Sequence, residues 1–173
     1  LMEAVEIPSR DGFQLVSYLT QARKPAGKAM VLFVHGGPWG RDNYGYNPYH
    51  QWLADRGYNV LSVNFRASTG FGKKFLNAGD KQWGRKMHDD LIDAVNWAIK
   101  NGYADPNQVA IMGGSYGGYA ALAGRGPMRA DHTLDLSVAM ATPPIRPHPA
   151  RWLLEQPEQT KRARLRDHRD LRN

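Results

Sequence analysis

The chain has 173 residues, enough for one domain with a hydrophobic core but short for two. Its 42% hydrophobic and 10% aromatic residues are typical of a globular protein, and the absence of cysteine excludes disulfide bonds and thiol catalysis. No apolar run approaches the roughly 20 residues that span a bilayer, and no signal peptide is recognisable near Leu1. We therefore expect a cytoplasmic protein without a membrane segment.

The formal net charge of +7 is spread unevenly along the chain. Residues 1–123 carry +3, whereas the much shorter stretch 124–173 carries +4 and holds six of the 11 prolines. All but one of the aromatic residues lie in the first stretch. We therefore expect a folded domain in residues 1–141 and an atypical, disorder-prone tail rich in arginine and proline in residues 142–173.

Several short segments have the composition of β-strands. Residues 3–7 and 13–19 alternate polar and apolar side chains around the turn-like Ser9-Arg10-Asp11-Gly12, which predicts an antiparallel hairpin at a sheet edge. Three apolar runs are typical of strands buried on both faces: 29–34, 58–65 and 108–112. Residues 134–141 are interpreted as a further strand.

Helical patterns alternate with these strands: a short one over 47–55, the clearest over 87–100, and a start over 119–123. In the clearest helix we expect Asp89, Asp90 and Asp93 to face water for the most part. Strands that alternate with helices predict an α/β fold, with a mostly parallel sheet and helices on both faces.

Three loops are expected to meet at the carboxyl ends of strands, where such sheets gather their functional groups: 35–40, 66–72 and 113–118. The last contains Gly113-Gly114-Ser115-Tyr116-Gly117, which has the G-x-S-x-G pattern of a nucleophile elbow. In that geometry a serine lies on a strained turn between a buried strand and a helix. Both neighbours are predicted here, so Ser115 is our candidate catalytic nucleophile.

A serine nucleophile also needs donors for the oxyanion that forms when it attacks a carbonyl. The N–H of Tyr116, which follows the nucleophile, is the first candidate. The second should come from the loop after an early buried strand, where His35-Gly36-Gly37-Pro38 lies. Because glycine lets a backbone N–H approach the substrate, we choose Gly37. His35 is expected to buttress this loop, and Arg66 either orients loops or meets a substrate carboxylate.

Four segments together resemble the catalytic domain of the prolyl oligopeptidase family of serine peptidases, especially its acylaminoacyl-peptidase and dipeptidyl-peptidase branches: 9–12, 35–38, 64–72 and 113–119. The resemblance covers residues 3–123. It implies an α/β-hydrolase fold and cleavage of peptide or acyl-peptide bonds through an acyl-enzyme on Ser115. An esterase on the same fold is an alternative. The family carries a β-propeller before this domain, whereas Glu3 resembles the domain's own start.

The acid and the base of a catalytic triad are not evident. The family places them on two later strands, yet only 58 residues follow Ser115, and nothing after residues 143–144 resembles the family. We interpret the domain as truncated, its C-terminal strands missing, and a tail read out of frame is one hypothesis. His50 and His88 are expected to serve packing or the surface. Substitutes for the triad would come from the tail, with His148 the first choice as base: His132, His148, His168, Asp131, Asp135, Asp167 and Asp170.

Metal and cofactor sites have little support. The sequence holds no H-E-x-x-H motif, and Gly70-Phe71-Gly72 does not complete a dinucleotide fingerprint because residue 75 is Phe. We expect neither group.

Two kinds of partner remain to be considered besides a peptide or ester substrate. A non-catalytic protein whose basic run 161–172 binds an acidic partner such as nucleic acid is the alternative class of function, less favoured because the run contains no aromatic residue. If the sheet ends at the strand 134–141, its unpaired edge favours self-association or aggregation.

Overall fold

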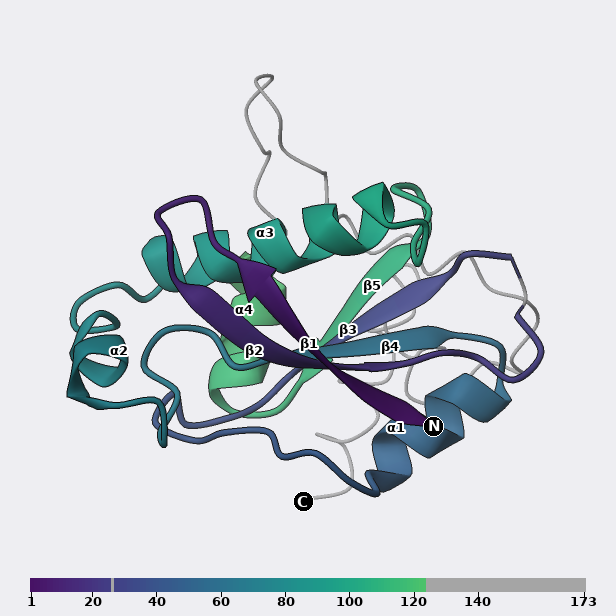
Figure 1. The fold of residues 1–173 in the computed structure, drawn as a ribbon, viewed down its shortest axis with the longest axis horizontal. Helices are drawn as coiled ribbons and strands as arrows, with labels where there is room; N and C mark the ends of the chain where they lie inside the picture. The colour runs from purple at the N-terminus through teal and green to yellow at the C-terminus, as the bar shows by residue number, and fades with distance from the viewer. Residues whose placement is uncertain (26, 124–173) are drawn as a thin grey trace, which may run out of the picture. The chain divides into compact units, whose positions relative to one another are not determined.

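The computed structural model describes residues 1–25 and 27–123, which form one sheet and four helices (Figure 1). The strands are β1 (Met2–Pro8), β2 (Gln14–Thr20), β3 (Met30–Val34), β4 (Asn59–Val63) and β5 (Val109–Gly113). The helices are α1 (Pro48–Asp55), α2 (Lys73–Asn77), α3 (Lys86–Lys100) and α4 (Tyr116–Ala123).

The sheet has the strand order β1-β2-β4-β3-β5. Strand β2 is antiparallel to both of its neighbours, whereas β3 is parallel to β4 and to β5. Four of these five strands therefore run in one direction. The predicted edge hairpin and mostly parallel sheet are confirmed.

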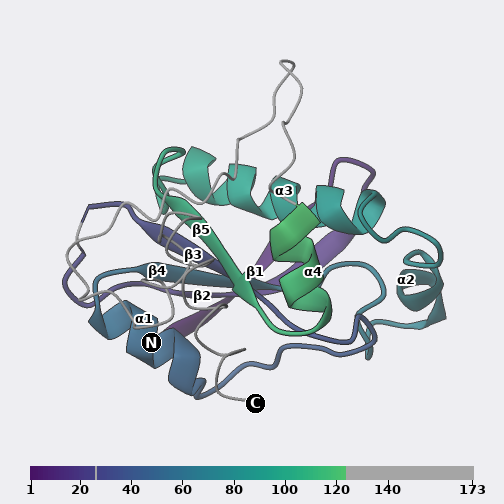
Figure 2. The same ribbon diagram turned by 180° about the vertical axis from the view of Figure 1, so that it is seen from behind.

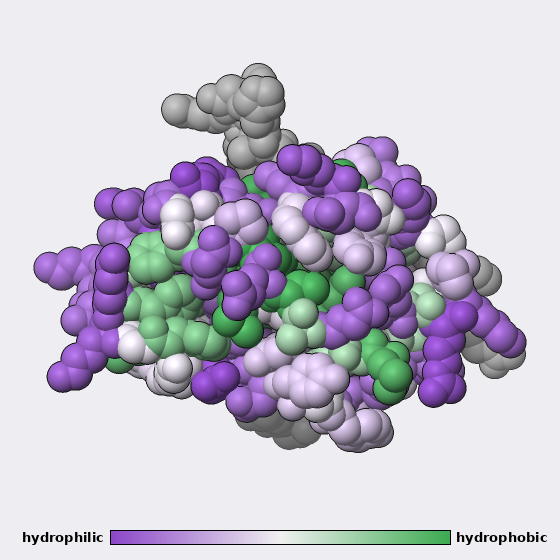
Figure 3. Space-filling view, viewed as in Figure 1, coloured by the Kyte–Doolittle hydropathy of each residue, from purple (hydrophilic) through white to green (hydrophobic). Residues whose placement is uncertain are grey.

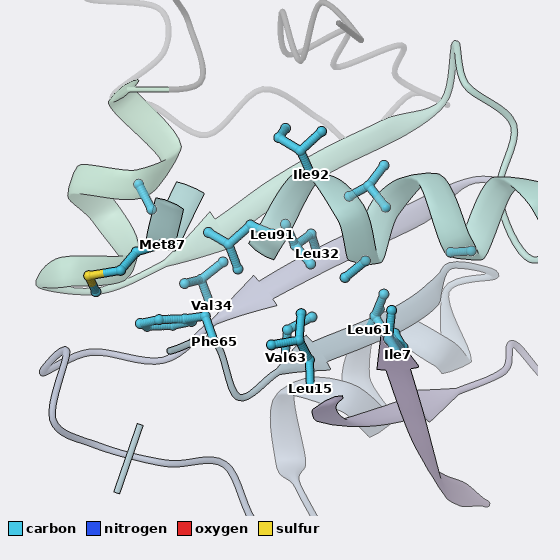
Figure 4. Close-up of a cluster of buried hydrophobic side chains, with 14 of the residues drawn as sticks. Ile7, Leu15, Leu32, Val34, Leu61, Val63, Phe65, Met87, Leu91 and Ile92 are labelled. Atoms are coloured by element: carbon cyan, nitrogen blue, oxygen red, sulfur yellow. The ribbon is translucent and has the colours of Figure 1, made fainter. Parts of the chain in front are cut away.

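One face of the sheet is covered by α3 and α4. Side chains of these helices join those of the strands in one buried cluster, part of which is shown in Figure 4. Among its fully or nearly fully buried members are Ile7, Leu15, Leu32, Val34, Leu61, Val63, Phe65, Met87, Leu91 and Ile92. The outer side of α3 is covered with hydrophilic side chains (Figure 3), as expected for an amphipathic helix.

The opposite face is covered by α1, which lies across the sheet from α3 in Figure 1. Leu53 of α1 packs on Val31 and Val60, which are paired neighbours on β3 and β4. Asn47 caps the helix, because its side chain accepts hydrogen bonds from the N–H groups of Tyr49 and His50. Helices therefore cover both faces, as predicted.

His50 ties α1 to the sheet through a buried polar contact. Its Nδ1 lies 2.9 Å from Thr20 Oγ1 on β2, and its Nε2 lies 2.7 Å from Ser62 Oγ on β4. The side chain is fully buried, so of the two predicted roles, packing or surface, the structure shows packing. Burial disfavours the charged ring and lowers the pKa of His50 to about 4.

Two helices differ from the sequence prediction. Helix α4 begins at Tyr116, three residues before the predicted start, because Gly117 and Gly118 are poor helix formers and hide the first turn from a propensity pattern. Helix α2 was not predicted, since its five residues are too few to show a helical period.

Several predicted features lie outside the described residues: the strand 134–141, the tail 142–173, and His132, His148 and His168. No helix in the described part of the chain has the length and apolar character needed to cross a bilayer.

The His50 contact predicts a pH dependence of stability. The unfolded ring titrates near 6.5 and the folded ring near 4, so the unfolded state binds more protons between these values. The contribution of the neutral His50 ring to the free energy of unfolding should therefore be fully present above pH 6.5. As the pH decreases to 4, the free energy of unfolding should fall, by no more than about 1.4 kcal/mol per pH unit. Urea denaturation between pH 7 and pH 4 measures this slope.

His50→Gln is the matched control, because glutamine hydrogen-bonds but does not titrate. The variant should lose the part of the slope that belongs to His50. An unchanged slope in the variant would contradict the assignment.

Candidate active site

Ser115 lies on the turn between β5 and α4, and its backbone has an uncommon conformation. Strand β5 ends at Gly113 and α4 begins at Tyr116, so only two residues connect them (Figure 2). Ser115 has φ +56° and is exposed. A positive φ is strained for a residue with a side chain, and such strain is often found at functional sites. The sequence prediction of a strained turn at Ser115 agrees with this geometry.

The glycines of the motif let α4 pack directly on the carboxyl end of β3. A Cβ on Gly117 would overlap the carbonyl oxygen of Val34, and a Cβ on Gly113 would lie 2.8 Å from the Cα of Gly117. Backbone atoms cannot yield to such contacts as a flexible side chain could. Both positions therefore require glycine, and the turn that carries Ser115 is held between β3 and β5.

The loop after β3 flanks the Ser115 side chain. A Cβ on Gly36 would lie 3.3 Å from the Cβ of Ser115 and 3.9 Å from its Oγ, so glycine leaves space beside the hydroxyl. Gly37, the next residue, is exposed and has φ +128°. Tyr116 is the first residue of α4, where an N–H has no intrahelical acceptor. The structure thus brings the loop of Gly37 and the N–H of Tyr116 to the same end of the sheet as Ser115.

Hydrogen bonds join the loops after β3 and β4. His35 Nε2 lies 2.9 Å from Ser68 Oγ, and the Thr69 N–H donates to the Gly40 carbonyl at 2.9 Å. His35 also contacts the carbonyl oxygen of Gly36 through Nδ1, at 2.8 Å. The three loops meet at the carboxyl ends of the strands, as predicted. Sequence reasoning missed Ser68, because an isolated loop serine has no distinctive pattern.

Arg66 anchors the loop after β4 through a buried ion-pair cluster. Its Nε and Nη2 donate to the two carboxylate oxygens of Asp90 at 2.8 and 2.6 Å, and Nη1 and Nη2 donate to Asp11 at 2.9 and 2.7 Å. These hydrogen bonds from Arg66 hold the pKa of the Asp11 carboxyl well below its usual range. Of the two predicted roles for Arg66, the structure shows the one that orients loops.

The expectation that Asp90 faces water for the most part is wrong, since its side chain is fully buried. Helical periodicity assigned Asp90 to the polar face of α3. Its carboxylate is buried because it forms an ion pair with the Arg66 guanidinium, which compensates its charge. Asp93 is partly exposed and pairs with the exposed Arg10 at 2.8 Å.

An aromatic group lies beside Ser115 on α4. The ring of Tyr116 is buried against Phe65 and Trp83, with centroid distances of 5.2 and 5.1 Å. Burial raises the pKa of the Tyr116 phenol, so this group stays protonated. Trp83 and Tyr119 are partly exposed beside it. The contacts of the Tyr116 ring with Phe65 and Trp83 hold the first residue of α4 in place.

No histidine among residues 1–25 and 27–123 hydrogen-bonds to Ser115. Both ring nitrogens of His35 have other partners, as do those of His50. His88 is partly buried on α3, where burial lowers its pKa. In the same residues, no group of three His, Cys, Asp or Glu side chains is placed to hold a metal ion. In the described part of the chain, Ser115 therefore has the geometry of a nucleophile but no histidine beside it that could act as its base.

Comparison with known proteins defines the class and then the family. The fold is that of α/β hydrolases: a puromycin-hydrolyzing peptidase of Mycobacterium tuberculosis superposes with a TM-score of 0.67 at 32% identity, over 70% of this chain and 20% of that one. An acylaminoacyl peptidase of Pyrococcus horikoshii superposes with a TM-score of 0.65 at 26% identity, over the same shares. The model of the prolyl oligopeptidase family matches residues 44–132, about half of the chain. The chain therefore belongs to the prolyl oligopeptidase family.

Curated relatives agree with this assignment. Dipeptidyl aminopeptidase BIII of Pseudoxanthomonas mexicana is 65% identical over 129 residues, which are 69% of this chain and 19% of that protein. The uncharacterized peptidase YuxL of Bacillus subtilis is 35% identical over 68% of this chain and 18% of its own length. The chain thus spans about a fifth or less of the length of the curated relatives it matches.

The Arg66 cluster predicts a large loss of stability in Asp90→Ala. Removing Asp90 leaves the buried Arg66 guanidinium with only Asp11, which is partly exposed, so the free energy of unfolding should fall by about 3–5 kcal/mol. Asp89→Ala is the control on the same helix, because its pair with Arg10 is exposed and should be worth about 1 kcal/mol or less. Urea denaturation followed by circular dichroism gives both values. Equal losses in the two variants would contradict the cluster's role.

Proposed function

We propose that this chain carries the nucleophile and the oxyanion donors of a serine peptidase. Ser115 is the attacking group, and the N–H groups of Tyr116 and Gly37 are the donors. The observation that carries the proposal is the exposed Ser115 at φ +56° between β5 and α4, with Gly36 beside its hydroxyl. Membership of the prolyl oligopeptidase family supports it.

The proposed reaction proceeds in two stages. Ser115 Oγ attacks the carbonyl carbon of the scissile amide while a base takes the hydroxyl proton, and negative charge forms on the carbonyl oxygen. The N–H groups of Tyr116 and Gly37 stabilise that charge because they are fixed before the reaction begins. The C–N bond then breaks, the amine leaves with a proton, and water hydrolyses the acyl-enzyme. The base comes from a part of the protein outside residues 1–123.

The substrates proposed are peptides with a free or acylated amino terminus. The relatives that support this choice are named as a dipeptidyl aminopeptidase and as an acylamino-acid-releasing enzyme, the latter at 35% identity in Oryza sativa. An ester would react through the same steps, with an alcohol in place of the amine as leaving group. Hydrolysis of a p-nitrophenyl ester without hydrolysis of dipeptidyl or acylaminoacyl anilides would favour an esterase.

A fluorophosphonate probe tests the nucleophile. In the folded chain, Ser115 Oγ should displace fluoride and form an Oγ–P bond, and mass spectrometry should place the adduct on the peptide that contains Ser115. Ser115→Ala should lose the adduct, and so should the heat-denatured wild-type chain, because labelling depends on the folded site. A label that persists in Ser115→Ala, or an adduct on another residue, would overturn the proposal.

A further inference from the structure

The two hydrogen bonds of the His35 ring define one tautomer. Nδ1 lies 2.8 Å from the carbonyl oxygen of Gly36, and Nε2 lies 2.9 Å from Ser68 Oγ. A carbonyl oxygen only accepts, so Nδ1 carries a proton and donates it. In the neutral ring, Nε2 is then an acceptor and the Ser68 hydroxyl is its donor. The Gly36 carbonyl thus fixes the tautomer, and the Ser68 hydroxyl, which can donate or accept, satisfies the remaining ring nitrogen.

The direction of the Gly36 carbonyl sets the direction of the Gly37 N–H. Both groups belong to the peptide unit that joins the two glycines, and this unit is trans. In a planar trans peptide the C=O and N–H bonds point in opposite directions. Holding the carbonyl toward His35 therefore turns the Gly37 N–H away from the ring. Glycine imposes little conformational preference of its own, so the hydrogen bond is an effective constraint here.

Packing restricts the His35 ring on two sides. The ring stacks on Phe65 with a centroid distance of 4.4 Å and an interplanar angle of 14°. A Cβ on Gly40 would lie 2.7 Å from the Gly36 oxygen and 3.3 Å from His35 Nδ1, so that side of the contact is closed by backbone. The Ser68 side chain is fully buried. The hydroxyl, the imidazole and the carbonyl thus form a continuous, enclosed chain of hydrogen bonds.

We propose that Ser68 is a positioning residue, which holds the His35 ring against the Gly36 carbonyl and thereby aims the Gly37 N–H at the oxyanion. The inference rests on the proposed function, in which Gly37 is an oxyanion donor. Ser68 touches no substrate. It acts through His35 and Gly36.

Loss of the Ser68 hydroxyl has a definite chemical consequence. A buried Nε2 without a donor is unfavourable, so the ring shifts to bring Nε2 toward water or another donor. This shift lengthens the hydrogen bond from Nδ1 to the Gly36 oxygen. The peptide unit is then less constrained, and the Gly37 N–H turns away from its position.

Nitrogen NMR of the labelled chain tests the first step without any catalysis. Long-range proton–nitrogen spectra report which nitrogen of His35 carries the proton. The wild-type ring should be protonated at Nδ1, Ser68→Ala should shift the Nε2 resonance and the Gly37 amide resonance, and Ser68→Thr should keep both as in the wild type. Ser17→Ala is the matched control, because Ser17 is also fully buried but donates to the Leu15 carbonyl on β2.

The rate of fluorophosphonate labelling tests the second step. Ser68→Ala should label at least about tenfold more slowly than the wild type. The slowing should not exceed the loss of about 10²–10³ in rate that follows when an oxyanion donor is removed outright. Ser68→Thr should restore the rate, and Ser17→Ala should retain it.

The outcomes separate this inference from the proposed function. A label that persists in Ser115→Ala overturns the proposed function, and the NMR spectra then decide the Ser68–His35 step alone. A wild-type ring protonated at Nε2, or a Gly37 amide unmoved in Ser68→Ala, overturns the inference. So does a labelling rate in Ser68→Ala equal to that of the wild type. Because the wild-type tautomer needs no variant, the inference stays testable even if Ser68→Ala does not fold.

Discussion

The contact between Gly117 and the carbonyl of Val34 is the constraint on which the rest of the site depends. It allows α4 to begin immediately beside the carboxyl end of β3, and β5 is already paired with β3 along its length. The two residues left between β5 and α4 must then turn sharply, which places Ser115 at φ +56°. The buried aromatic ring of Tyr116 and the apolar face of α3 hold this arrangement from the other side.

A second set of contacts holds the loops around that turn. Arg66 is bound by Asp90 on α3 and by Asp11 in the β1–β2 turn, so the hairpin, the helix and the loop after β4 are joined at one guanidinium. Two residues further along the same loop, Ser68 holds His35 in the loop after β3. Elements far apart in the sequence are thus joined by side-chain contacts at the carboxyl ends of the parallel strands.

Much of this arrangement could be predicted from the sequence, because it depends on local patterns. Apolar runs gave the buried strands, and the glycines around Ser115 gave the turn. What could not be predicted depends on partners distant in sequence. Asp90 occupies a position that periodicity assigns to the polar face, and only the presence of Arg66 explains its burial. Ser68 has meaning only once His35 is placed beside it. Helix α4 begins earlier than predicted because packing against β3 overrides the low helix propensity of Gly117 and Gly118.

The central claim is that Ser115 and two backbone N–H groups form one oxyanion-binding nucleophile site. Its most direct test is a crystal structure of the chain with a phosphonyl group bound to Ser115, since the phosphonyl oxygen imitates the oxyanion. We expect that oxygen to lie about 2.7–3.1 Å from the backbone nitrogens of both Tyr116 and Gly37. An oxygen turned toward solvent, or bound by neither nitrogen, would contradict the claim.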